Sequence, residues 1–219
     1  MRLAVCFGDS ITQQGFGAGG WLSLLAEQFA GGKADVLNRG CSGYTSALAL
    51  SHGYEWAFPP AAPAPLFVVV CFGANDAALH GFSQHVPLEA FASNLGRLLG
   101  LLRGRWPGLE LLLVSPPPLD DALWAAHCRA TSDGPPSRLL RVTAQYREAA
   151  AGVATRQGAV FVDLFDGRFD EPGLLSDGLH LTPAGNRLLF EAVWQRLSPA
   201  AKAAAPAFPY WRDLLEAPN

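Results

Sequence analysis

The sequence lacks the features that mark several large classes of protein. Its four cysteines form no close pair, so it predicts neither a zinc site nor a disulfide framework. The densest apolar run, APLFVVVCFGA, has the length of a strand, well short of the roughly 20 residues that cross a bilayer. The 16 basic residues are scattered and are outnumbered by 19 acidic ones. This charge distribution disfavours nucleic acid as a partner.

Several chemical motifs are also missing. The sequence contains no Walker phosphate loop, no dinucleotide-binding glycine pattern and no HExxH zinc motif, which disfavours nucleotide and metal chemistry. The first residues, MRLAVCFGDS, hold an apolar run that breaks at Gly8, too early for the apolar region of a secretory signal. Together with the absence of closely spaced cysteine pairs, this start predicts a reducing, cytoplasmic location and no membrane span, while a peroxisomal or other address read elsewhere in the chain stays open.

Short apolar runs alternate along the chain with longer stretches of helical spacing. The runs have strand length and end near Gly, Asn, Ser or Asp, at 3–7, 36–37, 66–72, 111–114 and 160–162. Apolar residues three or four positions apart predict helices at 21–29, 88–102, 139–154 and 183–197, and DALWAAHC is a candidate short helix. This alternation predicts an α/β fold, in which helices cover both faces of a mainly parallel sheet.

No repeat, charge block or flexible linker divides the 219 residues, so we expect one domain at residues 1–200, followed by a tail at 201–219. The tail ends in AFPYWRDLLEAPN, and Phe208, Tyr210, Trp211 and Leu214 would expose a large apolar area if it were free in water. We therefore expect the tail to dock on its own domain or on a second subunit. Both a monomer and a homodimer stay open.

Small and polar residues follow three of the predicted strands. Ser10 lies in GDSIT after the first, Gly40 and Gly43 lie in NRGCSGYT after the second, and Asn75 lies in GAND after the third. Each segment alone is explained equally well as a turn or a helix cap. Reactive groups of an open parallel sheet, however, gather where strands end, so these residues are expected at one edge.

A fourth segment, SDGLHLTPAGN, favours a chemical interpretation. It places Asp177 three residues before His180, so that the carboxylate can orient one imidazole nitrogen while the other faces outward. A serine such as Ser10 needs such a base to become a nucleophile. The oxyanion that it forms needs hydrogen-bond donors, which the side chain of Asn75 and the backbone N–H groups of Gly43 and Ser10 can supply.

The blocks GDSIT, NRGCSGYT, GAND and DGLHLT resemble those of the GDSL or SGNH hydrolases, in the same order. Further segments, among them DVLNRG, FGANDAAL, HVPLE and PYWRDL, resemble the isoamyl acetate-hydrolysing esterases within that superfamily. The resemblance implies a flavodoxin-like three-layer α/β/α sandwich, the SGNH hydrolase fold, without a cofactor or metal. The resemblance also implies that the catalytic residues are Ser10, Asp177 and His180, and that the oxyanion hole consists of Ser10, Gly43 and Asn75.

The sequence therefore predicts a serine esterase that hydrolyses small carboxylic esters through an acyl-enzyme intermediate. The resemblance favours short acyl groups such as acetate. Lipase, thioesterase, lysophospholipase or acyl-sugar esterase activity stays open, because the same site serves all of these substrates. A non-catalytic binding protein that keeps the fold is a further alternative, which the presence of Ser10, Asn75 and His180 disfavours.

Overall fold

A five-stranded sheet forms the centre of the chain. The structure, a computed structural model, describes residues 2–131, 134–206, 208 and 211–216. The strands are β1 (Leu3–Gly8), β2 (Asp35–Gly40), β3 (Phe67–Cys71), β4 (Glu110–Val114) and β5 (Val160–Val162). They pair in the order β2-β1-β3-β4-β5, and each pair is parallel. This is the strand order of flavodoxin-like folds, and the predicted α/β architecture is confirmed.

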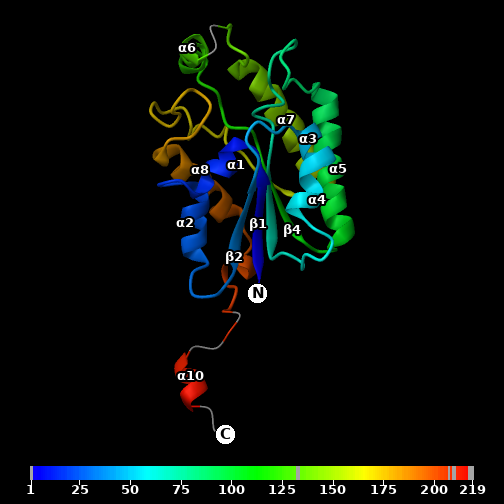
Figure 1. Ribbon diagram of the computed structural model, residues 1–219, viewed down its shortest axis with the longest axis vertical. Coiled ribbons are helices and arrows are strands. Elements are labelled where there is room, and N and C mark those ends of the chain that lie inside the picture. The colour runs from blue at the N-terminus through cyan, green and yellow to red at the C-terminus, as the bar shows by residue number, and fades with distance from the viewer. Residues whose placement is uncertain (1, 132–133, 207, 209–210, 217–219) are drawn as a thin grey trace.

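Helices cover both faces of this sheet and make a three-layer sandwich (Figure 1). One face carries α2 (Trp21–Gln28) and α8 (Pro183–Arg196), and the other carries α5 (Leu88–Arg105) and α7 (Leu140–Gln157). The candidate short helix is α6 (Asp121–Thr131). The remaining helical elements are short: α1 (Ser10–Gln13), η1 (Gln14–Phe16), α3 (Ser46–Leu48), η2 (Ala49–Gly53), α4 (Tyr54–Ala57), α9 (Pro199–Lys202) and α10 (Trp211–Glu216). No helix within the described ranges is long and apolar enough to cross a membrane.

Burial on both faces explains why the strands are apolar throughout. Successive side chains of a strand point to opposite faces. In β1, Ala4 and Cys6 enter the core beneath α2 and α8, whereas Val5 and Phe7 enter the core beneath α5 and α7. The thiol of Cys6 is fully enclosed, and burial raises its pKa above the usual range. Cys6 is therefore an apolar core residue, as the sequence indicates.

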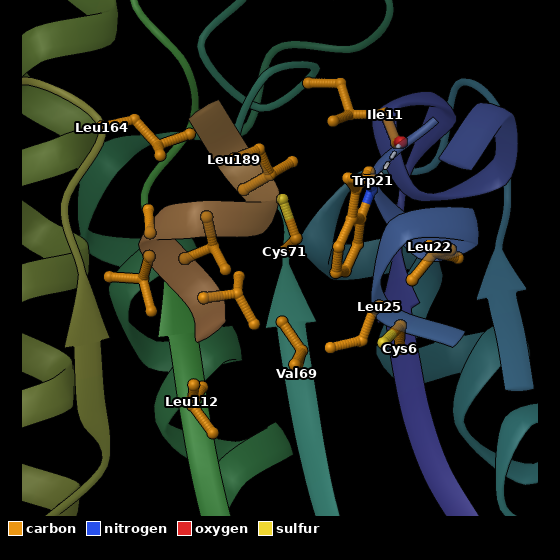
Figure 2. Packing of buried hydrophobic residues seen from close by; sticks show 14 of the residues in the cluster. Cys6, Ile11, Trp21, Leu22, Leu25, Val69, Cys71, Leu112, Leu164 and Leu189 are labelled. Carbon is orange, nitrogen blue, oxygen red and sulfur yellow. Dashed lines mark hydrogen bonds between the residues drawn. The ribbon is translucent and has the colours of Figure 1, made fainter. Parts of the chain in front are cut away.

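Trp21, the first residue of α2, occupies the centre of the core beneath α2 and α8 (Figure 2). Its ring is fully buried and lies near Cys6 of β1 and Cys71 of β3. The indole Nε1–H donates a hydrogen bond to the carbonyl oxygen of Ile11, at 3.2 Å. This bond attaches α1, which begins at Ser10, to the hydrophobic core.

The sequence pattern did not predict the helical segment formed by α3, η2 and α4. It begins directly after Thr45, whose hydroxyl caps α3 by accepting a hydrogen bond from the N–H of Leu48 at 3.3 Å. The segment ends at Phe58, which is 2% exposed and packs its ring 5.5 Å from that of Phe7. It therefore covers β1 on the face of the sheet that carries α5.

Only part of the predicted tail is described. Ala201 of α9 and Ala204 are buried against the domain. Figure 1 shows α10 apart from the sheet, and the side chains of Phe208 and Trp211 are 62% and 56% exposed. Tyr210 and residues 207, 209 and 217–219 lie outside the described residues, as does the side chain of Leu214. Docking of this tail stays a prediction.

Candidate active site

The segments that follow β1, β2 and β3 meet at the carboxyl-terminal edge of the sheet. From β1 the chain crosses to β2 on one side and then to β3 on the other, so the strand order reverses at β1. In parallel α/β sheets, ligands bind in the crevice at such a reversal. Ser10, Gly43 and Asn75 follow these three strands directly.

Ser10 occupies the first position of α1, in a turn that is fixed from both sides. The side chain of Asp9 accepts a hydrogen bond from the N–H of Ile11 at 3.1 Å and thereby caps the helix. The N–H of Asp9 donates to the carbonyl oxygen of Cys71 in β3, at 3.2 Å. The preceding Gly8 has no room for a side chain, since a Cβ atom there would lie 2.2 Å from the hydroxyl of Thr12. This turn presents Ser10 at the end of β1.

The side chains of Ser10, His180 and Asp177 form one hydrogen-bonded series. The Oγ atom of Ser10 lies 3.0 Å from Nε2 of His180, and Nδ1 of the same ring lies 2.7 Å from Oδ2 of Asp177. The backbone N–H groups of Leu179 and His180 donate to Oδ1 of Asp177, at 2.9 and 2.8 Å. Partial burial opposes ionisation of Asp177, but the bonds from the His180 ring and from these two N–H groups hold its pKa well below the usual range. Asp177 is therefore a carboxylate at neutral pH.

The loop that carries His180 is held by its surroundings. A Cβ atom at Gly178, where φ is +95°, would lie 2.4 Å from the backbone nitrogen of Trp124 in α6, so only glycine fits. The hydroxyl of Thr182 caps α8 by accepting from the N–H of Gly185 at 3.3 Å, which confirms the predicted start of this helix. Oδ1 of Asn186 accepts from the N–H of Trp21, at 3.1 Å. The loop thus lies against α6 and leads directly into α8, which is itself hydrogen-bonded to α2.

Two of the predicted oxyanion donors lie in neighbouring loops. The Nδ2 group of Asn75 donates to the carbonyl oxygen of Tyr44, the residue after Gly43, at 2.9 Å. Gly43 has a φ of +77°. The third donor, the N–H of Ser10, belongs to the first turn of α1, where N–H groups have no partner within the helix.

The sequence analysis missed two buried acids that adjoin these residues. Asp76 accepts hydrogen bonds from the N–H and the hydroxyl of Ser46, while burial raises its pKa to about 6. Burial likewise raises the pKa of Asp9 to about 7, with a smaller contribution from the charge of Asp76. Both acids stand beside predicted site residues, in GDSIT and GAND, and that adjacency was the available signal.

Arg138, which precedes α7 and is 5% exposed, also adjoins the site and was not predicted from the sequence. Its Nη2 donates to Oδ1 of Asn75, at 3.0 Å. No pattern in the polar segment around it indicated this contact. Among the described residues, no group of three or more His, Cys, Asp or Glu side chains is placed to hold a metal ion.

A cavity of about 470 Å³ lies beside the site rather than within it. It opens to solvent and is lined by residues 118–123, Leu140 and residues 169–175, and neither Ser10 nor His180 lines it. The loop from Asp177 to His180 adjoins its wall, because the N–H of Asp120 donates to the carbonyl oxygen of Gly178 at 2.9 Å.

Comparison with known proteins gives consistent matches over most of the chain. The sequence profile of the GDSL-like lipase/acylhydrolase family matches residues 6–188. A Bos taurus protein named isoamyl acetate-hydrolyzing esterase 1 homolog is 40% identical, across 96% of this chain and 87% of the relative. A GDSL esterase/lipase of Arabidopsis thaliana is 38% identical, across 90% and 86%. The crystal structure of the lipase/acylhydrolase from Enterococcus faecalis superposes with a TM-score of 0.72 at 23% identity, covering 95% of this chain and 100% of that one.

Proposed function

Because the chain belongs to the GDSL-like lipase/acylhydrolase family and is a carboxylic-ester hydrolase, we propose that Ser10 attacks the ester and carries the acyl group as a covalent intermediate. The observation that carries this proposal is the series of two hydrogen bonds from Ser10 through His180 to Asp177, at 3.0 and 2.7 Å. Family membership counts against the alternative of a non-catalytic binding protein.

In the first step, Ser10 Oγ attacks the carbonyl carbon while Nε2 of His180 accepts the hydroxyl proton. The carboxylate of Asp177 holds the ring with Nδ1–H toward itself, so that Nε2 is the nitrogen free to accept. The oxyanion accepts hydrogen bonds from the N–H groups of Ser10 and Gly43 and from the side chain of Asn75. His180 then returns its proton to the departing alcohol.

In the second step, water replaces the alcohol. His180 accepts a proton from the water molecule as its oxygen attacks the acyl carbon of the intermediate. The second tetrahedral oxyanion uses the same three donors, and its collapse breaks the bond to Ser10 and releases the carboxylic acid. The Ser10 hydroxyl regains its proton from His180, and the site is ready for another ester.

We assign short acyl groups, acetate foremost, as the preferred substrates. Relatives at 36–40% identity are named for hydrolysis of isoamyl acetate, and the chain covers 87% of their length. The site chemistry is the same for a thioester, a lysophospholipid or an acylated sugar. A series of p-nitrophenyl esters from acetate to palmitate tests the assignment, with kcat/KM expected to fall as the acyl chain lengthens. A maximum at long chains would favour a lipase instead.

Labelling with a fluorophosphonate, followed by peptide mapping, tests the nucleophile. We expect the label on Ser10, and we expect Ser10→Ala to abolish both labelling and turnover while leaving the unfolding curve unchanged. Ser51→Ala is the matched control, because Ser51 Oγ also contacts an imidazole, Nδ1 of His52 at 2.7 Å, but on an exposed surface. Ester hydrolysis that survives Ser10→Ala would refute the proposed mechanism.

A further inference from the structure

Arg138 is a buried cation, and its side-chain hydrogen bonds within the part of the chain that the structure describes reach uncharged groups. It donates to the carbonyl oxygen of Ala74 at 2.7 Å, the hydroxyl of Ser137 at 2.9 Å, Oδ1 of Asn75 at 3.0 Å and Oε1 of Gln84 at 2.6 Å. The side chain is 5% exposed. Burying a charge is costly, and the electrostatic attraction of Asp9, Asp177 and Asp76 offsets part of the cost here. The hydrogen bonds of the guanidinium, in contrast, go to these four uncharged acceptors.

The chemistry of arginine determines how Asn75 is turned. A guanidinium has five N–H donors and no acceptor, so only the carboxamide oxygen of Asn75 can face it. The NH₂ group must then point away from Arg138, and it does so, donating to the carbonyl oxygen of Tyr44 at 2.9 Å. Rotating the carboxamide by 180° would set its NH₂ against the guanidinium and remove the donor from the opposite side.

Arg138 orients the carboxamide of Gln84 in the same way, and Gln84 in turn contacts the loop that carries Gly43. Oε1 of Gln84 accepts from Nη2 of Arg138, which turns Nε2 of Gln84 toward the carbonyl oxygen of Gly43, at 2.9 Å. Gly43 needs such a restraint, because its φ of +77° is a conformation that glycine leaves readily. One guanidinium thus restrains both loops that carry proposed oxyanion donors.

We infer that Arg138 is a positioning residue for ester hydrolysis, which holds Asn75 directly and Gly43 through Gln84 in the orientation that receives the oxyanion. The inference rests on the proposed function, since it assigns Arg138 a role through those donors. Electrostatic stabilisation depends on donors that are already oriented before the charge develops. Arg138 supplies that orientation without touching the reacting atoms.

Arg138→Met is expected to lower kcat by about 10²-fold with little change in KM, because misplaced donors affect the transition state more than the bound ester. Arg138→Lys keeps the charge but loses the planar fork that reaches Asn75 and Gln84 together, so it is expected to recover at most part of kcat. Arg105→Met is the matched control. Arg105 also donates to backbone carbonyl oxygens, those of Phe58 and Pro60 among them, but it lies on α5 away from the site.

A double-mutant cycle separates positioning from a merely structural role. If Arg138 acts through Asn75, the variant with both Arg138→Met and Asn75→Ala should lose no more than about 10-fold beyond Asn75→Ala alone, and this remaining loss is the share of Gly43. Independent effects would multiply instead. Multiplying losses, a loss confined to KM, or full recovery by Arg138→Lys would each overturn the inference.

The outcomes also separate this inference from the proposed function. Turnover that survives Ser10→Ala removes the proposed function, whatever Arg138 does. An inactive Ser10→Ala together with parental kcat in folded Arg138→Met removes the positioning role alone. If Arg138→Met does not fold, Gln84→Leu removes the hydrogen bond to Gly43 and leaves the buried cation in place. That variant is then expected to lower kcat several-fold, and parental kcat would overturn the inference.

Discussion

Replacing Asp9 by asparagine is expected to make the free energy of unfolding less dependent on pH. Asp9 is 1% exposed, and its Oδ2 atom has no hydrogen-bond partner among the residues that the structure describes. Burial raises its pKa from 3.8 to about 7, although the hydrogen bond from Ile11 opposes the shift. Between these two values, the folded protein holds a proton on Asp9 that the unfolded chain has released.

The sign and size of the effect follow from this difference. Because the folded state binds more protons, its stability falls as the pH rises from about 4 through 7. A pKa of about 7 instead of 3.8 corresponds to ~4 kcal/mol, at 1.36 kcal/mol per unit. The substituted carboxamide would be uncharged at every pH, and its oxygen can still accept the hydrogen bond from Ile11. Its additional unpaired N–H adds a constant cost of ~1–3 kcal/mol.

The measurement is urea unfolding of the parent and of Asp9→Asn at each pH from 4 to 8, followed by tryptophan fluorescence. The difference in unfolding free energy should move by ~4 kcal/mol in favour of Asp9→Asn between pH 4 and pH 8. Contributions from Asp177 cancel, because both proteins keep it. Asp35→Asn, which removes an exposed carboxylate at the start of β2, is the control. A difference that stays constant over this pH range would refute the reasoning.

Three further perturbations follow from the structure. Asn75→Ala is expected to lower kcat by about 10²–10³-fold with KM little changed, since it removes one donor that acts mainly in the transition state; a loss that falls mostly on KM would make Asn75 a substrate-binding group. Gly40→Ala would place a Cβ atom 2.0 Å from the backbone nitrogen of Gln13 and should lower the free energy of unfolding in urea by ~3 kcal/mol. At Gly100 in α5 a Cβ atom would have nothing within 4 Å, so Gly100→Ala should raise the free energy of unfolding by ~0.5–1 kcal/mol. Equal effects of the two alanines would contradict the steric argument. Removing residues 208–219 is expected to lower the melting temperature or to change the elution volume in gel filtration, because the apolar side chains of Phe208 and Leu215 are 62% and 76% exposed and would be covered on docking. If neither changes, the tail does not dock.

Local patterns were sufficient to predict the main elements of the fold. The strands could be found because both of their faces are buried, which makes them apolar throughout. Thr182 and Pro183 mark the start of α8 by their own capping chemistry. The segment from Ser46 to Ala57 escaped prediction because a π-helical turn separates two short α-helical elements, and no single period describes the whole segment.

The candidate site divides in the same way between local and distant contacts. Asp177 and His180 are three residues apart, so their spacing alone indicated a contact. The pairing of Ser10 with His180 spans 170 residues, so no local spacing indicated it; it was predicted from the need of a serine nucleophile for a base and from the resemblance of the combined sequence blocks. Arg138 meets Ala74 across 64 residues from a polar segment without periodicity. Sequence reasoning had no means to find that contact.

The separation between Ser10 and His180 has a consequence for biosynthesis. Their hydrogen bond closes a loop of 170 residues. Such non-local contacts form late in folding, because the chain entropy is lost before the contact contributes its favourable energy. Synthesis proceeds from the amino terminus, so the strand that presents Ser10 leaves the ribosome long before the loop that carries His180. A nascent chain that stops before residue 177 therefore holds the proposed nucleophile without its proposed base. Ester hydrolysis by stalled chains should begin only after residue 180 has cleared the exit tunnel, which makes the enzyme a reporter of its own translation past that residue.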